Sequence, residues 1–310
     1  MNKTFRNVLL ALCLPFGLSA GHATGSGSTP LPDPAELQLA SVHAAVAPLD
    51  SGGMLYAKFA DRSVAIASIT KLMTAMVVLD SGQPLDEWLP ILKRQDNPPK
   101  NSFSRLRPGS EARRGDLLGI TLMSSENLAA YVLARHHPGG REAFIAAMND
   151  KARALDMHQT RFVDPSGLWP ENRASAGDLL KMVRAAYAYP EIREMSTGTS
   201  RRVHFRGPRY SLDFGNTNAL VHSSRWDLKL SKTGYINEAG RCLVMVADVG
   251  GEPLAMVLLD SFGTRTPLGD AGRIRRWLET GSGGAVAGAA LDYERRRAAA
   301  LAGADTVGGQ

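Results

Sequence analysis

Apolar residues recur at intervals of three and four along residues 68–80, and this period predicts an amphipathic helix. The residues of its apolar face are Ile69, Leu72, Met73, Met76 and Val77. Helical periodicity continues in several segments to about Met195. Within it, residues 175–178 begin like a capping box, and Pro190 should end the helix that follows. The middle of the chain is therefore expected to be mainly helical.

Strand patterns lie on both sides of this helical region. Before it, residues 42–47 and 54–59 predict two strands joined by the turn Asp50-Ser51-Gly52-Gly53. After it come the runs LKLSKTGYI, RCLVMVADV and PLAMVLLD, and the glycines between the last two predict a hairpin. The pattern GDAGRIRRWLE predicts a closing helix. Together these elements predict an α+β fold, an antiparallel sheet covered by helices with an inserted helical lobe.

Residues 1–23 have the pattern of a secretory signal peptide. Two basic residues, Lys3 and Arg6, precede an apolar run over residues 8–18, which small residues follow. The apolar run is too short for a lasting transmembrane helix. Cleavage near Ala23 would place the mature protein in the periplasm.

Composition divides the remainder of the chain into three segments. Residues 24–36 are mostly Gly, Ser, Thr and Pro and predict a linker. Residues 37–281 contain the helix and strand patterns and have enough apolar residues for one large folded domain. Residues 282–310 are rich in Gly and Ala and predict a mobile tail without a membrane anchor.

Charge, cysteine and histidine content argue against several functions. The formal net charge is +6, but the clearest basic run, 295–297, is short, so no nucleic-acid partner is expected. Cleavage leaves one cysteine, Cys242, which lies in a strand pattern and should be a small core residue without a disulfide partner. His136 and His137 have no further ligands at suitable spacing, so no metal site is expected.

Lys71 stands three residues after Ser68, and apolar residues surround both. On a helix this spacing can lay the lysine amine over the serine hydroxyl. An amine held among apolar side chains loses solvation, so its pKa falls and it can act as a base toward the hydroxyl. The simpler role for Ser68 is a helix cap, because serine is common at helix starts.

Two further motifs decide between these roles. Ser125 and Asn127 lie in a Ser-Ser-Glu-Asn stretch between two helical patterns, and Lys232-Thr233-Gly234 comes late in a strand pattern. In this order the motifs resemble the signatures of the penicillin-binding serine D,D-peptidases, S-x-x-K, S-x-N and K-T-G. The resemblance covers residues 42–279. The stretches most similar to the low-molecular-mass branch are IASITKLMTAMVVLD, LMSSENLAA, FVDPSGL and SKTG.

The resemblance implies catalytic roles for three residues. Ser68 would attack the carbonyl of a D-Ala residue and form an acyl-enzyme, with Lys71 as the proton acceptor. Ser125 would relay a proton to the leaving amine, and Asn127 would hydrogen-bond the substrate peptide. The implied partners are peptidoglycan stem peptides as substrates and β-lactams as covalent inhibitors. No cofactor is implied.

The strand motif implies binding roles. Lys232 would lower the pKa of Lys71 further and attract a substrate carboxylate, to which Thr233 would donate a hydrogen bond. Gly234 would let the substrate approach the strand, because a side chain there would block it.

An oxyanion site and a further cation would complete this arrangement. The expected oxyanion donors are the backbone N–H groups of Ser68 and Tyr235. Arg265, after the last strand, would add carboxylate binding. The stretch 164–167, Asp-Pro-Ser-Gly, lacks the pattern of a hydrolase nucleophile elbow and should form a turn.

Other functions with the same motifs remain to be compared. A class A β-lactamase uses a separate glutamate for deacylation, and no Glu-x-x-Leu-Asn stretch lies between Asn127 and Lys232. An inactive wall-binding module would not need Lys71 beside Ser68. Carboxypeptidases of this branch usually carry a second strand-rich domain, for which the residues after the closing helix are too few. We therefore expect a D-alanyl-D-alanine endopeptidase that cuts cross-links, with a D,D-carboxypeptidase as the alternative.

Overall fold

The structure is a computed structural model that describes residues 32–50, 53–98 and 103–307. The signal peptide predicted for residues 1–23 lies outside the described residues. So does most of the predicted linker, 24–36, whose end forms the short 3₁₀ helix η1 (Pro34–Glu36).

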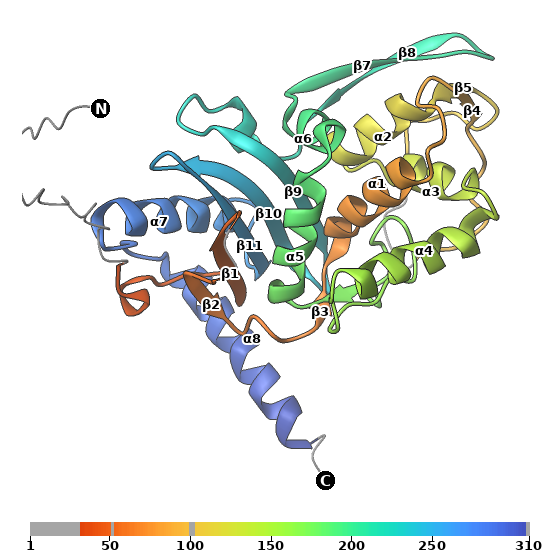
Figure 1. Ribbon diagram of the computed structural model, residues 1–310. Helices are drawn as coiled ribbons and strands as arrows, with labels where there is room; N and C mark the ends of the chain where they lie inside the picture. The colour runs from red at the N-terminus through yellow and green to blue at the C-terminus, as the bar shows by residue number, and fades with distance from the viewer. Residues whose placement is uncertain (1–31, 51–52, 99–102, 308–310) are drawn as a thin grey trace, which may run out of the picture. The chain divides into compact units, whose positions relative to one another are not determined.

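A five-stranded antiparallel sheet forms the centre of the described residues, with strand order β2-β1-β11-β10-β9 (Figure 1). Its strands are β1 (His43–Pro48), β2 (Tyr56–Lys58), β9 (Leu228–Ile236), β10 (Gly240–Val249) and β11 (Glu252–Ser261). β1 pairs with β11, so the sheet joins distant parts of the chain. β9 carries the K-T-G motif and is an edge strand beside β10. The predicted antiparallel sheet is confirmed, and so is the hairpin of β10 and β11.

Both faces of the sheet are covered, which explains why its strands are apolar along most of their length. Successive side chains of β10 point into opposite cores: Val244 and Val246 into one, Leu243 into the other. The second core also contains the fully buried Trp277 of α7 (Thr266–Thr280).

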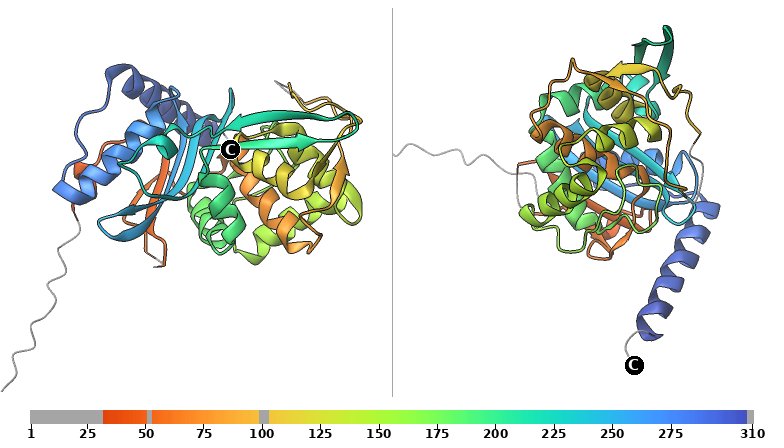
Figure 2. Two further views of the ribbon diagram at one scale, coloured as in Figure 1. Left: turned by 90° about the horizontal axis from the view of Figure 1, so that it is seen from above. Right: turned by 90° about the vertical axis from the view of Figure 1, so that its right-hand side faces the viewer.

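Helices lie on either side of the sheet (Figure 2). α7 covers one face, and a lobe that includes α1 to α6 covers the other. The helices of the lobe are α1 (Thr70–Asp80), α2 (Arg114–Met123), α3 (Asn127–Arg135), α4 (Gly140–Ala154), α5 (Ala176–Tyr187) and α6 (Pro190–Thr197). As predicted, Ser175 caps α5, with its hydroxyl accepting a hydrogen bond from the backbone of Asp178. This arrangement confirms the predicted α+β class and the inserted helical lobe.

Short strand pairs complete the lobe: β3 (Val64–Ala65) with β6 (Arg173–Ala174), β4 (Trp88–Pro90) with β5 (Glu111–Arg113), and β7 (Ser200–Phe205) with β8 (Tyr210–Gly215). The β7–β8 hairpin extends along the top of the lobe in Figure 1 and was not predicted. Only one face of β7 is buried, through Val203 and Phe205, while the exposed side chains of Arg202 and His204 alternate with them. Because β7 mixes apolar and polar residues, its sequence does not stand out as a strand pattern.

The segment 282–310, predicted to be a mobile tail, instead contains helix α8 (Gly288–Val307). The alanines of this segment led to the prediction of a mobile tail, but alanine has the highest helix propensity. The helix is attached to the sheet at Asp260, which accepts hydrogen bonds from Tyr293 Oη at 2.6 Å and Arg297 Nε at 2.7 Å. The composition therefore gave the wrong prediction for this part of the tail.

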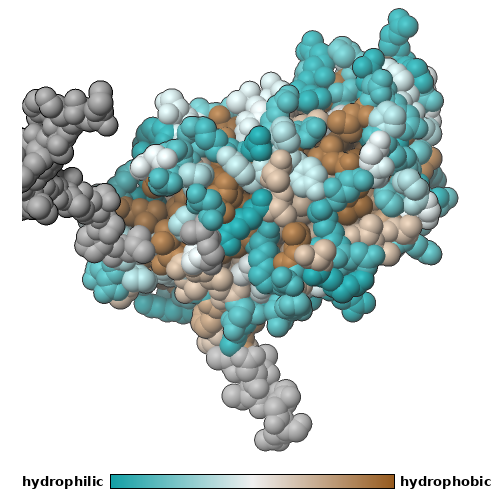
Figure 3. Space-filling view, viewed as in Figure 1, coloured by the Kyte–Doolittle hydropathy of each residue, from teal (hydrophilic) through white to brown (hydrophobic). Residues whose placement is uncertain are grey.

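Hydrophobic residues reach the surface in several separate areas on the face shown in Figure 3, with hydrophilic residues between them. Such a mixture is usual, because apolar atoms make up much of any folded protein's surface. Within the described part of the chain, no helix is both long and apolar enough to span a membrane.

Ser68 lies outside the α-helix in which it was predicted. α1 begins at Thr70, and Ser68 occupies a preceding 3₁₀ turn, η2 (Ala67–Ile69), where no side-chain cap is formed. Ala67 has a left-handed backbone, with φ of 47°. Gly167, with φ of 79°, packs against Ala67 so closely that a Cβ on Gly167 would overlap the Ala67 carbonyl. The turn is therefore fixed by backbone packing instead of by a cap.

Gly167→Ala should destabilise the protein by about 3 kcal/mol or more, since it combines a left-handed backbone cost with a backbone clash. Gly250 provides a matched control, because it has φ of 66° but a Cβ added there would meet no other atom within 4 Å. Gly250→Ala should cost only about 1 kcal/mol, the left-handed term alone. Urea unfolding of the two variants measures the difference, and equal losses would contradict the packing argument.

Candidate active site

A pocket of about 900 Å³ runs from Ser68 past the edge strand β9 to the first turn of α7. It brings together seven of the residues predicted from the motifs and the resemblance: Ser68, Ser125, Asn127, Thr233, Gly234, Tyr235 and Arg265. The remaining two, Lys71 and Lys232, are buried, with 0% and 1% of their surface exposed. Segments far apart in the sequence thus meet at one site.

Lys71 is held by three acceptors. Its amine lies 2.8 Å from Ser68 Oγ, 2.8 Å from Asn127 Oδ1 and 2.5 Å from the carbonyl oxygen of Ser166. The spacing of three residues on the chain brings the amine to Ser68, while α3 and the turn after Phe162 supply the other two partners. The amine is therefore positioned from three separate elements.

Burial lowers the pKa of Lys71 to about 7, because a charged amine in the interior loses its hydration. The charges of Asp164 and Glu126 raise this pKa, and the charge of Arg94 lowers it, but burial is the largest cause. A large fraction of the Lys71 amine is thus neutral near neutral pH, as a base must be.

Lys232 affects this balance differently from the prediction. The charge repulsion between the two lysines lowers the pKa of Lys232 and not that of Lys71. The pKa of Lys232 falls well below its usual value, mainly because the amine is buried and also because of the charge of Lys71. The cation that lowers the pKa of Lys71 is Arg94, which stacks over the rings of Tyr131 and Trp169. Sequence reasoning did not find Arg94, because it lies in no motif.

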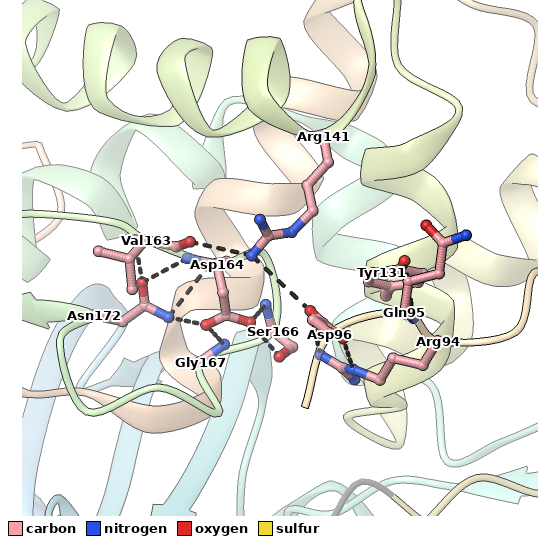
Figure 4. Close-up of polar contacts among 10 residues, drawn as sticks. All are labelled: Arg94, Gln95, Asp96, Tyr131, Arg141, Val163, Asp164, Ser166, Gly167 and Asn172. Atoms are coloured by element: carbon pink, nitrogen blue, oxygen red, sulfur yellow. Dashed lines mark hydrogen bonds and ion pairs between the residues drawn. The ribbon is translucent and has the colours of Figure 1, made fainter. Parts of the chain in front are cut away.

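The turn Asp164–Gly167 is a second feature that sequence reasoning did not connect with the site. Asp164 is fully buried and accepts hydrogen bonds from the backbone of Ser166 at 2.7 Å and of Gly167 at 3.0 Å. Asn172 also donates to Asp164 and accepts from the backbone of Val163 at 2.7 Å (Figure 4). These bonds aim the Ser166 carbonyl at Lys71. The predicted turn is present, and it positions the candidate base.

Arg141 of α4 braces the segment that leads into this turn. Arg141 donates to the carbonyl of Val163 at 3.4 Å and lies 3.9 Å from Asp96, which also pairs with Arg94 at 2.5 Å (Figure 4). On the other side, Thr74 of α1 donates to the carbonyl of Pro165 at 2.6 Å. The turn is thus tied to α4 through Val163 and to α1 through Pro165.

Ser125 and Asn127 lie where α2 gives way to α3. Glu126 between them caps α3 by accepting hydrogen bonds from Leu128 at 2.8 Å and Ala129 at 3.2 Å. Ser125 has a left-handed backbone, with φ of 61°, and lines the pocket. A non-glycine residue in this conformation costs energy, which is typical of functional turns. The capping glutamate explains how this strained turn is held.

Gly234 has a structural role in addition to the one predicted. A Cβ on Gly234 would come within 3.0 Å of the backbone nitrogen of Ser68 and 3.2 Å of the Ile66 carbonyl oxygen. The missing side chain therefore leaves room for the turn that carries Ser68, as well as for any substrate. β9 can pack directly on this turn only because the residue is glycine.

The other predicted binding residues line the wall beyond Ser68. Thr233 Oγ1 lies 2.6 Å from Thr217 Oγ1, and Lys232 donates to the carbonyl of Thr233 at 2.9 Å. Tyr235 is 48% exposed, and Arg265 occupies the N-cap position of α7 without a side-chain capping hydrogen bond. Polar groups are therefore distributed along the whole length of the pocket.

Cysteine and histidine are two further residue types that bear on the chemistry of the site. Cys242 is buried, and burial raises the pKa of its thiol to about 12, so it stays protonated as a small core residue should. Within residues 32–50, 53–98 and 103–307, no group of three or more His, Cys, Asp or Glu side chains could hold a metal ion.

Known proteins resemble this chain over most of its length. The profile of the D-alanyl-D-alanine carboxypeptidase family matches residues 30–263. The chain is 47% identical to a D-alanyl-D-alanine endopeptidase of Pseudomonas aeruginosa over 295 residues, or 94% of this chain and 95% of the relative. It is 44% identical to a D-alanyl-D-alanine endopeptidase of Escherichia coli over 298 residues, or 96% and 95%.

A solved structure with a bound β-lactam is also similar. Penicillin-binding protein D2 from Listeria monocytogenes, in its cefotaxime-bound form, has a TM-score of 0.68 and 29% sequence identity. The match covers 79% of this chain and 98% of that one.

The rate of acylation by a β-lactam should rise with pH through about 7, because deprotonation of Lys71 produces the base. At pH 6 the rate should be roughly a tenth of its plateau, as expected for a single group that must lose a proton. Stopped-flow measurement with a chromogenic cephalosporin gives this profile. A rate independent of pH between about 5.5 and 8.5 would exclude Lys71 as the titrating base.

Lys71→Arg should lower the acylation rate by about 10²–10⁴-fold, the usual contribution of a general base. Arginine keeps the positive charge but cannot lose a proton near neutral pH. Lys229→Arg, at a lysine whose side chain is 40% exposed, is the control and should acylate normally. Rapid acylation of Lys71→Arg would mean that Lys71 acts by charge alone.

Proposed function

Because the chain belongs to the D-alanyl-D-alanine carboxypeptidase family of serine peptidases, we propose that it is an endopeptidase that cleaves D-alanyl cross-links in peptidoglycan. The reaction passes through an acyl-enzyme on Ser68. The observation that carries the acyl-enzyme mechanism is the 2.8 Å contact between Ser68 Oγ and a buried lysine amine whose pKa is about 7.

The partners of Lys71 direct its lone pair. A neutral amine has two N–H donors and one lone pair, and the Asn127 and Ser166 oxygens can only accept. When both N–H groups are used on these oxygens, the lone pair is left for the hydroxyl of Ser68. The Ser68 proton then moves to Lys71 as Ser68 Oγ attacks the substrate carbonyl.

Hydrogen-bond donors must stabilise the negative charge that develops on the carbonyl oxygen. The backbone N–H groups of Ser68 and Tyr235 supply them, on the two sides of the pocket where η2 and β9 meet. Collapse of the intermediate breaks the D-alanyl C–N bond, and the leaving amine takes a proton from Lys71 through Ser125. Water then attacks the ester, which releases the acyl product and restores Ser68.

The substrate is recognised by its backbone and carboxylates. The amide nitrogen of Asn127 faces no acceptor among the described residues, which leaves it free to donate to a substrate carbonyl. Thr233, Lys232 and Arg265 supply donors and positive charge for a substrate carboxylate. The substrates are peptidoglycan stem peptides, and β-lactams acylate the same serine.

The endopeptidase assignment rests on the relatives of this chain. Two proteins named D-alanyl-D-alanine endopeptidase are 47% and 44% identical to it, and the matches cover 95% of each. The pocket also continues well beyond Ser68, to the first turn of α7, which gives room for a leaving group larger than one D-Ala. D,D-carboxypeptidase activity is the alternative and uses the same catalytic residues.

Location and domain organisation follow from the sequence. The signal peptide over residues 1–23 would deliver the mature protein to the periplasm, where peptidoglycan lies. The catalytic domain spans residues 37–281. The reaction requires neither a cofactor nor a metal ion.

A β-lactam should form one covalent adduct, on the peptide that contains Ser68. The expected mass increase is that of one β-lactam molecule, because ring opening adds the drug without a leaving group. Penicillin treatment followed by mass spectrometry tests this, with Ser224→Ala, at an exposed serine, as the control. Undiminished labelling of Ser68→Ala would show that the nucleophile is another residue.

A cross-linked muropeptide dimer should be cleaved faster than a monomeric pentapeptide. Both present the same D-alanyl group to Ser68, so the difference must come from binding energy on the leaving side. Chromatography of both digests measures release of monomers and of free D-Ala. Faster release of D-Ala, with the dimer left intact, would replace the endopeptidase assignment by carboxypeptidase while keeping the acyl-enzyme mechanism.

A further inference from the structure

We propose that Arg241, stacked on Tyr235, is a subsite that binds a carboxylate of the stem peptide on the acyl side of the scissile bond. This inference rests on the proposed endopeptidase function and assigns a specificity residue to it. Arg241 lies in none of the sequence motifs.

Arg241 is held at the pocket wall by its neighbour across the sheet. It pairs with Tyr235 between β10 and β9, so the two side chains lie on the same face. The guanidinium carbon is 3.8 Å from the centroid of the Tyr235 ring. The ring is fixed at its other end, where Tyr235 Oη donates to Asn237 Oδ1 at 2.9 Å. Both residues line the pocket that contains Ser68.

Charge in the pocket favours an anionic ligand. Of the described residues that line it, Arg241 and Arg265 are charged and none is acidic. No described carboxylate forms an ion pair with either arginine, whereas many arginines elsewhere, such as Arg114 and Arg202, pair with acids. The positive charge of Arg241 is therefore available to a ligand.

The geometry of the stack suits a carboxylate. A guanidinium that lies flat on an aromatic ring keeps its N–H groups in the plane, at its edges, where they can form two parallel hydrogen bonds. Carboxylates match this spacing. A lysine at the same position could supply the charge but not the paired donors.

Position along the strand indicates which carboxylate is bound. Tyr235 lies two residues, or about 7 Å, beyond Thr233 along β9, and Arg241 lies opposite Tyr235 on β10. The carboxylate of a leaving D-Ala is assigned to Thr233, Lys232 and Arg265, and the scissile carbonyl oxygen to the N–H groups of Ser68 and Tyr235. The leaving side therefore extends from Tyr235 toward Thr233, and Arg241 lies on the acyl side. The stem peptide that is transferred to Ser68 carries free carboxylates on that side, whereas penicillin has no such peptide.

The test compares Arg241→Gln with the wild type on three substrates: a cross-linked muropeptide dimer, the same dimer with its free carboxylates amidated, and penicillin. We expect Arg241→Gln to lower kcat/KM for the free-acid dimer about tenfold, the effect of one charge-assisted contact. Acylation by penicillin should stay within about twofold. Amidation should cost the wild type more than it costs the variant, because only the wild type loses the arginine contact.

Arg209→Gln serves as the matched control, since Arg209 is exposed in the β7–β8 turn and should change none of the three rates. If the wild type acylates with penicillin but cleaves no dimer, the proposed endopeptidase function fails. If it cleaves the dimer and Arg241→Gln cleaves it equally well, the subsite is wrong. Loss of penicillin acylation in Arg241→Gln would also overturn the inference, because Arg241 would then support the catalytic residues themselves.

Discussion

The active site depends on how closely two backbone segments pack against the turn that carries Ser68. Gly167 presses on Ala67 from one side, and Gly234 of β9 lies against the Ser68 nitrogen from the other. Neither contact leaves space for a side chain. The helical lobe supplies the first segment and the edge of the sheet supplies the second, so the nucleophile is fixed only when both halves of the fold are assembled.

The buried amine of Lys71 sets the chemistry that this packing makes possible. Burial favours the neutral base, but the carboxylate of Asp164 favours the charged form. The same carboxylate builds the turn that offers the Ser166 carbonyl to Lys71. Asp164 therefore raises the pKa of Lys71 but also fixes the orientation of its amine. Burial and the charge of Asp164 act in opposite directions, and the resulting pKa of Lys71 is about 7.

The sequence predicts well those features that repeat or form motifs. Strand β9 and the hairpin of β10 and β11 follow from apolar runs and glycines, and the S-x-x-K, S-x-N and K-T-G motifs identify the residues that meet in the pocket. Contacts between distant segments leave no such signal. Asp164 stands in an ordinary turn sequence, and the space needed beside Gly234 is set by a turn far away in the chain. Helix α8 was not predicted, because the Gly- and Ala-rich composition of the tail was interpreted as a sign of disorder, although alanine favours helix.

The pairing of β1 with β11 has a consequence for how the chain acquires its structure. His43 lies opposite Leu259, so the central strands come from opposite ends of the described chain, with the entire helical lobe between them. Contacts of such long sequence separation form slowly, because a large loop must close first. Synthesis of β11 must therefore precede closure of the sheet. Until then the growing polypeptide has no complete core, and the edge strand that holds the Ser68 turn has no sheet to join.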